Sequence, residues 1–123
     1  MSASTRNVLA WVLQGLAALA FIGSGANKLL HLPQTVAMFG QLGLPGWLAY
    51  LVAGGEVLGG IGLLVPRFTR LAAAGLVPIM LGAAFMHATK IPGGLLPNGL
   101  PALVLLAMLA AILGLRRPQS VAA

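Results

Sequence analysis

The feature that most constrains this chain is the presence of four long apolar stretches within only 123 residues. Hydrophobic residues make up 59% of the sequence, and the chain has seven lysines and arginines but a single acidic residue. A soluble domain carries charge on about a quarter of its residues, because its surface has to be hydrated. The composition therefore excludes a soluble enzyme and a disordered segment, and it predicts an integral membrane protein. The cations are scattered rather than clustered, so no nucleic-acid partner is expected.

The apolar stretches cover about residues 8–30, 47–65, 68–88 and 97–115. A helix of about 20 apolar residues crosses the hydrocarbon core of a bilayer, so each stretch is expected to be a transmembrane helix, and the fourth is the shortest. We therefore predict an all-α fold, a four-helix transmembrane bundle that forms a single domain over residues 1–123. Pro33 is expected to open a short interfacial helix in the first link that turns Val36 and Phe39 inward.

The distribution of positive charge predicts the orientation in the membrane. With four spans, both termini lie on the same side as the second link. Lysines and arginines are retained mainly on the cytoplasmic side, so we expect both termini in the cytoplasm and the protein in the bacterial inner membrane. The first and third links carry two cations, Lys28 and Lys90, whereas the termini and the second link carry five: Arg6, Arg67, Arg70, Arg116 and Arg117.

Glu56 is the only acidic residue, and it lies inside the second span. A charge at bilayer depth costs at least a few kcal/mol, so such a residue is a candidate for function. The same span holds five glycines within nine residues, which predicts a central helix in a tight bundle. At 100° per residue, the neighbours of Glu56 on the helix surface are mostly small, so its side chain is expected to face other helices. These neighbours are Ala49, Val52, Ala53, Gly59, Gly60 and Leu63.

Estimates of how deep each polar residue lies in the membrane suggest which of them could contact Glu56. With a rise of 1.5 Å per residue, Glu56 lies about 15 Å from the end of its span and Gln14 about 9 Å from the start of the first span. Gln14 is thus expected to be the polar residue of the first span closest to Glu56 in depth. A direct contact with Lys28 would span about 15 Å of depth and would require helix tilt, a shifted helix start or a bridging water.

The other candidate site residues are expected at the outer end of the bundle, away from the cytoplasmic termini. Asn27, Lys28 and His87 lie there, and His31 and Lys90 belong to the same region. In a functional interpretation, Glu56 is the floor and Lys28 and His87 form the mouth of a polar pocket. In a structural interpretation, Glu56 fixes the register of the helices and the other residues anchor the bundle at the interface.

Several kinds of chemistry are not expected from these residues. The chain has no cysteine, and two histidines with one acid do not complete a tetrahedral metal site. The chain also has no aspartate, so it lacks a Ser/His/Asp catalytic set. An enzyme that acts on a lipid with His87 as base would lack a second catalytic group. We therefore predict no autonomous enzymatic activity, no catalytic residue and no metal.

Specific runs of sequence resemble a known family. They are GSGANKL at residues 23–29, GLPGWLAY at 43–50, EVLGGIGLLVPR at 56–67, TRLA at 69–72 and AAFMH at 83–87. In this order and spacing, they are similar to the DoxX-like family of small four-helix bacterial membrane proteins. The resemblance covers residues 8 to about 115, and Lys28 and Glu56 match the family's motif positions.

The resemblance implies a membrane part of a redox or stress-response assembly, since the family takes its name from a membrane subunit of a thiosulfate:quinone oxidoreductase. We expect a non-catalytic subunit or a lipid- or quinone-binding module that has no intrinsic cofactor. Its expected partners are membrane lipids and a membrane or peripheral redox protein, and self-association into a homo-oligomer stays open. A small proton-coupled transporter that uses Glu56 is the alternative.

Overall fold

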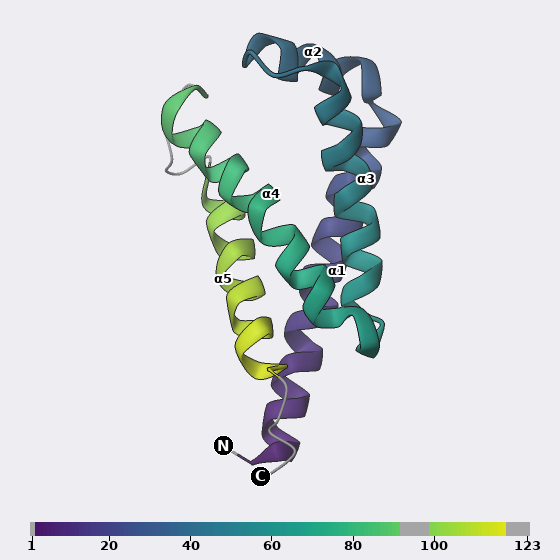
Figure 1. Cartoon of the computed structure of the whole chain (residues 1–123), viewed down its shortest axis with the longest axis vertical. Coiled ribbons are helices and arrows are strands. Elements are labelled where there is room, and N and C mark those ends of the chain that lie inside the picture. Colours follow the sequence, from purple (N-terminus) through teal and green to yellow (C-terminus); the bar gives the residue numbers. More distant parts are fainter. Residues whose placement is uncertain (1, 92–98, 118–123) are drawn as a thin grey trace.

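The computed structural model describes residues 2–91 and 99–117, and its regular elements there are all helices (Figure 1). In chain order they are α1 (Ala3–Leu30), α2 (Leu32–Gln41), α3 (Gly46–Leu63), the one-turn 3₁₀ helix η1 (Pro66–Phe68), α4 (Thr69–Thr89) and α5 (Leu100–Leu115). The start of α1 and the end of α5 lie together at what we call the terminal end, whereas α2 lies across the opposite end, the α2 end (Figure 1).

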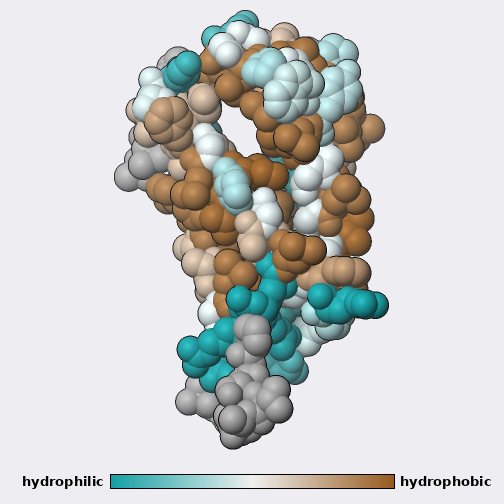
Figure 2. Space-filling view, viewed as in Figure 1, coloured by the Kyte–Doolittle hydropathy of each residue, from teal (hydrophilic) through white to brown (hydrophobic). Residues whose placement is uncertain are grey.

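The bundle has the surface of a membrane protein. Three stretches, Ala3–Leu30, Gly46–Leu63 and Pro66–Thr89, are long and apolar enough to cross a bilayer, and Leu100–Leu115 is a shorter apolar helix. Hydrophobic side chains cover much of the visible face, and hydrophilic residues gather toward the terminal end (Figure 2). The predicted all-α membrane bundle is thus confirmed. The cytoplasmic location of the termini stays a prediction, and residues 97 and 98 of the predicted fourth span lie outside the described residues.

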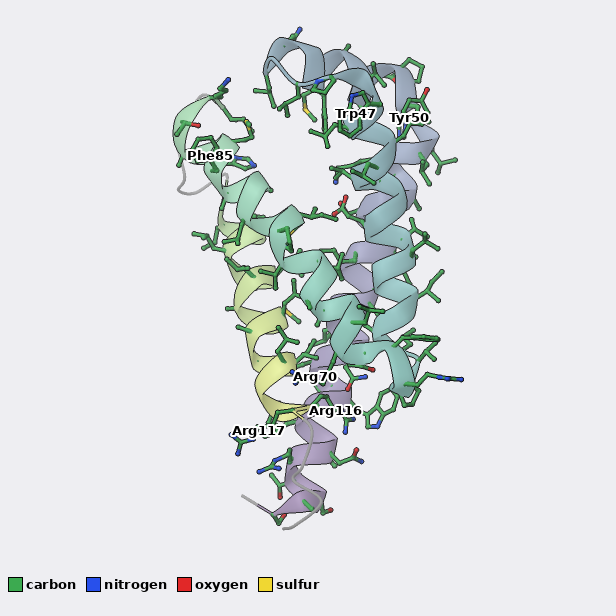
Figure 3. The ribbon with its side chains drawn as sticks, viewed as in Figure 1. Trp47, Tyr50, Arg70, Phe85, Arg116 and Arg117 are labelled. Carbon is green, nitrogen blue, oxygen red and sulfur yellow. The ribbon has the colours of Figure 1, made fainter. Side chains whose placement is uncertain are left out.

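Polar and aromatic anchors occupy the two ends of the bundle. Arg70, Arg116 and Arg117 lie toward the terminal end, and Trp47 and Tyr50 lie near the α2 end (Figure 3). Both aromatic side chains are exposed. Exposed aromatics with a polar tip suit the boundary between lipid and water, and arginines suit the ends of spans. The two ends of the molecule therefore match the two surfaces of a bilayer.

Local sequence signals explain where the helices begin. α1 begins at Ala3, where the Ser2 hydroxyl accepts a hydrogen bond from the Thr5 backbone N–H at 3.1 Å. α2 has Pro33 in its first turn, where a proline costs no helical hydrogen bond. Gly43, with a φ of +80°, reverses the chain between α2 and α3. The short helix expected at Pro33 is therefore present, and Phe39 is buried within it as predicted.

Close contact between α1 and α3 is possible because each helix has a glycine at the crossing. A Cβ atom on Gly25 would lie 2.6 Å from the carbonyl oxygen of Ala53, and one on Gly60 would lie 3.1 Å from that of Ala18. Contacts of this kind let helix backbones approach more closely than larger side chains allow. α3 packs against α1, α2 and α4, and these two glycines set the register of α3 against α1.

The hydrophobic core lies between α1, α3, α4 and α5. There Leu76 of α4 fills the space above Gly59 of α3, since a Cβ atom on Gly59 would lie 2.7 Å from the Leu76 side chain. Toward the α2 end, α4 diverges from α3 (Figure 1). The bundle is therefore tightly packed at one end and open at the other. The core residues are Ala17, Ala18, Phe21, Leu63, Ala73, Leu76, Met80, Ala102, Leu109 and Ile112.

Replacing Gly25 by alanine is expected to destabilise the bundle, because the new methyl group would meet the backbone of α3. Overpacking of this kind costs about 1–3 kcal/mol, and it would lower the midpoint of thermal unfolding in detergent micelles. Gly23→Ala is the matched control, because a Cβ atom at Gly23 meets nothing within 4 Å. An equal loss of stability in both variants would contradict the proposed role of Gly25 in the crossing.

Candidate functional site

The single acidic side chain of the chain takes part in an ion pair inside the bundle. Glu56 in α3 is 1% exposed, and its Oε1 lies 2.5 Å from Nζ of Lys28 in α1. Ser24, one turn before Lys28, donates its hydroxyl to Glu56 Oε2 at 3.1 Å and accepts a hydrogen bond from Lys28 Nζ at 2.8 Å. We call Ser24, Lys28 and Glu56 the ion-pair cluster. Each charged group in it has one charged partner and one hydroxyl partner.

The contact between Lys28 and Glu56 is direct, although the sequence placed them about 15 Å apart in depth. α1 extends beyond α3 at the terminal end (Figure 1), so that Gln14 lies level with Leu63. The two helices are also antiparallel, and side chains lean toward the N-terminus of their own helix. Lys28 therefore leans toward the terminal end while Glu56 leans toward the α2 end. The shifted start of α1 and these opposed directions close the gap without a bridging water.

Gln14 connects four helices near the terminal end and lies away from Glu56. It is completely buried, and its Nε2 donates to the Leu63 carbonyl oxygen at 2.6 Å. Its Oε1 accepts a hydrogen bond from Nε of Arg116, at the end of α5, at 2.7 Å. The prediction that Gln14 is the polar residue closest in depth to Glu56 is therefore wrong, because Ser24 takes that place. Because Nε2 also donates to the Thr69 hydroxyl of α4 at 3.3 Å, Gln14 links α1 to α3, α4 and α5.

A pocket opens beside the ion-pair cluster, where α4 diverges from α3. Its volume is about 410 Å³, and Figure 2 shows an opening between the parts of the bundle near the α2 end. Three residues with titratable side chains line it: Lys28, Glu56 and His87. The rest of the lining is Met38, Phe39, Leu42, Leu44, Leu48, Leu51, Val52, Pro78, Ile79, Met80, Gly82, Ala83, Met86 and Ile91. The part of the lining that the structure describes is thus apolar except for the ion pair and one histidine.

His87 faces this pocket from α4. Its Nδ1 is buried and has no hydrogen-bond partner within residues 2–91 and 99–117. A buried polar atom without a partner loses its hydration with no compensating bond, which costs about 1–3 kcal/mol. Exposed Phe85, two residues before His87, lies across the gap from Trp47 and Tyr50 at the same end of the bundle (Figure 3). His87 is therefore the side chain on the α4 wall with unused capacity to bind a polar group.

Asn27 is not brought to the pocket. Its side chain is exposed on α1, and its backbone carbonyl accepts hydrogen bonds at the end of that helix. The donors are the backbone N–H of His31 at 3.1 Å and, in one tautomer, Nδ1 of the same histidine at 2.9 Å. Asn27 and His31 thus terminate α1. Of the five candidate residues from the sequence, the structure brings together Lys28, Glu56 and His87.

The sequence-based search missed Ser24 as a member of the site. Ser24 and Lys28 are four residues apart, a spacing that places two side chains on the same face of a helix. This spacing could have identified the serine as a partner of the lysine. The contribution of α2 to the pocket, through Met38 and Phe39, has no comparable signal, because the position of α2 depends on the turn at Gly43.

Removing one member of the ion pair is expected to cost more stability than removing both. Lys28→Met would leave the Glu56 carboxylate buried with Ser24 as its partner, and we expect a loss of about 2 kcal/mol in the free energy of unfolding. Lys28→Met combined with Glu56→Leu would remove both charges and restore most of that loss. Equilibrium unfolding in mixed detergent micelles measures both effects.

Lys90→Met serves as the matched control, because Lys90 is an exposed lysine whose Nζ, within residues 2–91 and 99–117, donates to the Leu42 carbonyl oxygen at 3.3 Å. Its effect should stay below about 0.5 kcal/mol, as for most exposed positions. If the effects of Lys28→Met and Glu56→Leu simply added in the double variant, the coupling between the two charges would be refuted.

Comparisons with known proteins place the chain in a family. The sequence model of the DoxX family matches residues 10–89, which is more than half of the chain. The "Putative oxidoreductase CatD" of Bacillus subtilis (strain 168) is 27% identical over 81 residues, which are 66% of this chain and 60% of that protein. The chain thus covers less than two thirds of this relative's length. No solved structure matches the present chain. This multi-pass membrane protein belongs to the DoxX family.

Proposed function

We propose that this protein is a non-catalytic binding module of a redox assembly in the bacterial inner membrane, and that it holds a lipid-soluble molecule, such as a quinone, in the pocket between α3 and α4. The observation that carries this proposal is a charged pair on the wall of an otherwise apolar pocket within a membrane bundle. Such a pocket suits a molecule with an apolar body and one polar end.

The size and lining of the pocket support a small-molecule ligand. Binding pockets usually have volumes of about 300–1,000 Å³ and apolar walls with a few polar groups. This pocket has a volume of about 410 Å³ and offers Lys28, Glu56 and His87 as polar groups. Its apolar lining comes from α2, α3 and α4. A lipid-soluble ligand could therefore enter from the bilayer without leaving an apolar environment.

The polar groups can bind an oxygen atom of a ligand. An ammonium group has three N–H donors. Lys28 directs two of them to Ser24 and Glu56 at 2.8 and 2.5 Å, which leaves one for a carbonyl or hydroxyl oxygen. The buried Nδ1 of His87 offers a second polar contact from the facing helix. A quinone has two carbonyl oxygens, so its headgroup suits a site with polar groups on two walls.

The redox part of the proposal rests on the family and on the name of one relative. CatD of Bacillus subtilis is named as an oxidoreductase, and that name belongs to CatD. The present chain has no cysteine, so its own side chains offer no thiol chemistry. A bound quinone would supply the electron-carrying group, while Lys28, Glu56 and His87 would bind and orient it.

A small proton-coupled transporter is the second candidate, because the same pocket reaches the only carboxylate of the chain. The ion pair favours a binding module, since a proton or a cationic substrate would have to compete with Lys28 for Glu56. We expect Glu56→Gln to leave the efflux of cationic compounds from cells unchanged. Loss of efflux in that variant, with normal amounts of protein in the membrane, would instead support transport.

Filling the pocket should remove its ligand. Ala83 is half-buried on the α4 wall, and Ala83→Trp would place a large side chain in the cavity. We expect at least about tenfold less quinone per protein after purification in mild detergent, because the ligand and the indole ring compete for one volume. Solvent extraction followed by chromatography measures the quinone content.

Ala74→Trp is the matched control, because Ala74 is an exposed alanine of the same helix outside the pocket lining. It should retain the quinone content of the unaltered protein. If the unaltered protein carries no quinone after growth in quinone-producing cells, or if both tryptophan variants lose it equally, the proposed occupant of this pocket is wrong.

A further inference from the structure

A second pocket lies at the terminal end of the bundle, between the start of α1 and the end of α5. Its volume is about 320 Å³, and it lies at the opposite end from the ion-pair cluster. Among the described residues, six line the pocket, and three of these are arginines. The lining residues are Ala3, Arg6, Asn7, Leu115, Arg116 and Arg117. This arginine pocket takes no part in the proposed function.

Arg116 is held in a fixed position within the arginine pocket. Its Nε donates to Oε1 of Gln14 at 2.7 Å, and Nη1 donates to Oδ1 of Asn7 at 3.0 Å. Its guanidinium carbon also lies 5.4 Å from the centre of the Trp11 ring. Since a guanidinium group has five N–H donors, donors remain for a ligand. The side chain is therefore oriented before any ligand binds.

The positive charge of this pocket has no carboxylate side chain to neutralise it. Glu56 is the only acidic residue of the chain, and Lys28 is its ion-pair partner. Among the described residues, the contacts that orient Arg116 come from neutral amides and an indole ring, and none of them carries a negative charge. Three guanidinium groups around one open pocket therefore favour a ligand with negative charge.

We propose that the arginine pocket binds the phosphate group of an anionic phospholipid. Arginine binds phosphate oxygens with two parallel N–H bonds, and basic pockets at the ends of transmembrane helices bind anionic headgroups. The surroundings also suit acyl chains, because Leu9, one turn along α1 from Arg6, is 42% exposed. A phosphate between the arginines would thus lie at the membrane surface, with its acyl chains alongside α1.

Native mass spectrometry of the full-length protein in neutral detergent tests this site, with added phosphatidylglycerol, phosphatidylcholine or inorganic phosphate. We expect phosphatidylglycerol to be retained in preference to phosphatidylcholine, whose choline group cancels the phosphate charge. Inorganic phosphate should not displace it, because the acyl chains contribute to binding. Arg6→Gln and Arg117→Gln should each weaken phosphatidylglycerol binding about fivefold.

Arg67→Gln is the matched control, because Arg67 is an exposed arginine in η1 that does not line the pocket. It should leave phosphatidylglycerol binding unchanged. Arg116→Gln is a further variant, but it also removes the bonds to Gln14 and Asn7, so Arg6→Gln and Arg117→Gln carry the test. The proposal is overturned by equal retention of both lipids, by displacement with inorganic phosphate, or by an equal effect of Arg67→Gln.

Discussion

The close contact between α1 and α3 determines the position of the other polar groups in this bundle. Gly25 and Gly60 remove the Cβ atoms that would keep the two backbones apart, and they fix one antiparallel register. In that register, Ser24 and Lys28 meet Glu56, and Gln14 meets the last turn of α3. Hydrophobic association is weak within lipid, so small residues and buried polar contacts have to specify the pairing. The glycines and the ion-pair cluster therefore both specify the pairing of α1 with α3.

The bundle combines a packed half with an open half. In the packed part, α1, α3, α4 and α5 share a hydrophobic core, and near the terminal end Gln14 links all four helices by hydrogen bonds. Toward the α2 end, α4 diverges from α3 and the pocket beside Glu56 opens. The packed half can hold the four helices in place while the open half exposes polar groups at membrane depth. A binding site is therefore formed without loosening the core.

Much of the fold could be predicted from the sequence, because hydrophobic stretches and helix periodicity are local properties. The apolar stretches predicted a membrane bundle, and the predicted face of Glu56 is confirmed, since Ala49, Ala53, Gly60 and Leu63 are buried with it. The short helix at Pro33 was also predicted correctly. These inferences needed only neighbouring residues and the geometry of a single helix.

The site itself was only partly predictable, because it depends on how separate helices are placed. The depth estimate assumed that adjacent spans end level with one another, whereas α1 extends beyond α3. It also ignored the direction in which each side chain leans, which brings Lys28 and Glu56 together. The contact of Gln14 with Arg116 joins residues 102 positions apart, and no local pattern indicates it. The pocket depends on the divergence of α4, which is a property of the whole bundle.

The ion pair also bears on how the chain enters the membrane during synthesis. Lys28 and Glu56 belong to different spans and lie 28 positions apart in the sequence. A charge at the centre of a span costs about 3 kcal/mol on insertion scales, and Glu56 lies in the interior of α3. When α3 leaves the translocon, its glutamate finds its cation only if α1 is still beside it. α1 and α3 would therefore enter the bilayer as a pair. The ion pair between Lys28 and Glu56 thus bears on membrane insertion as well as on the folded bundle.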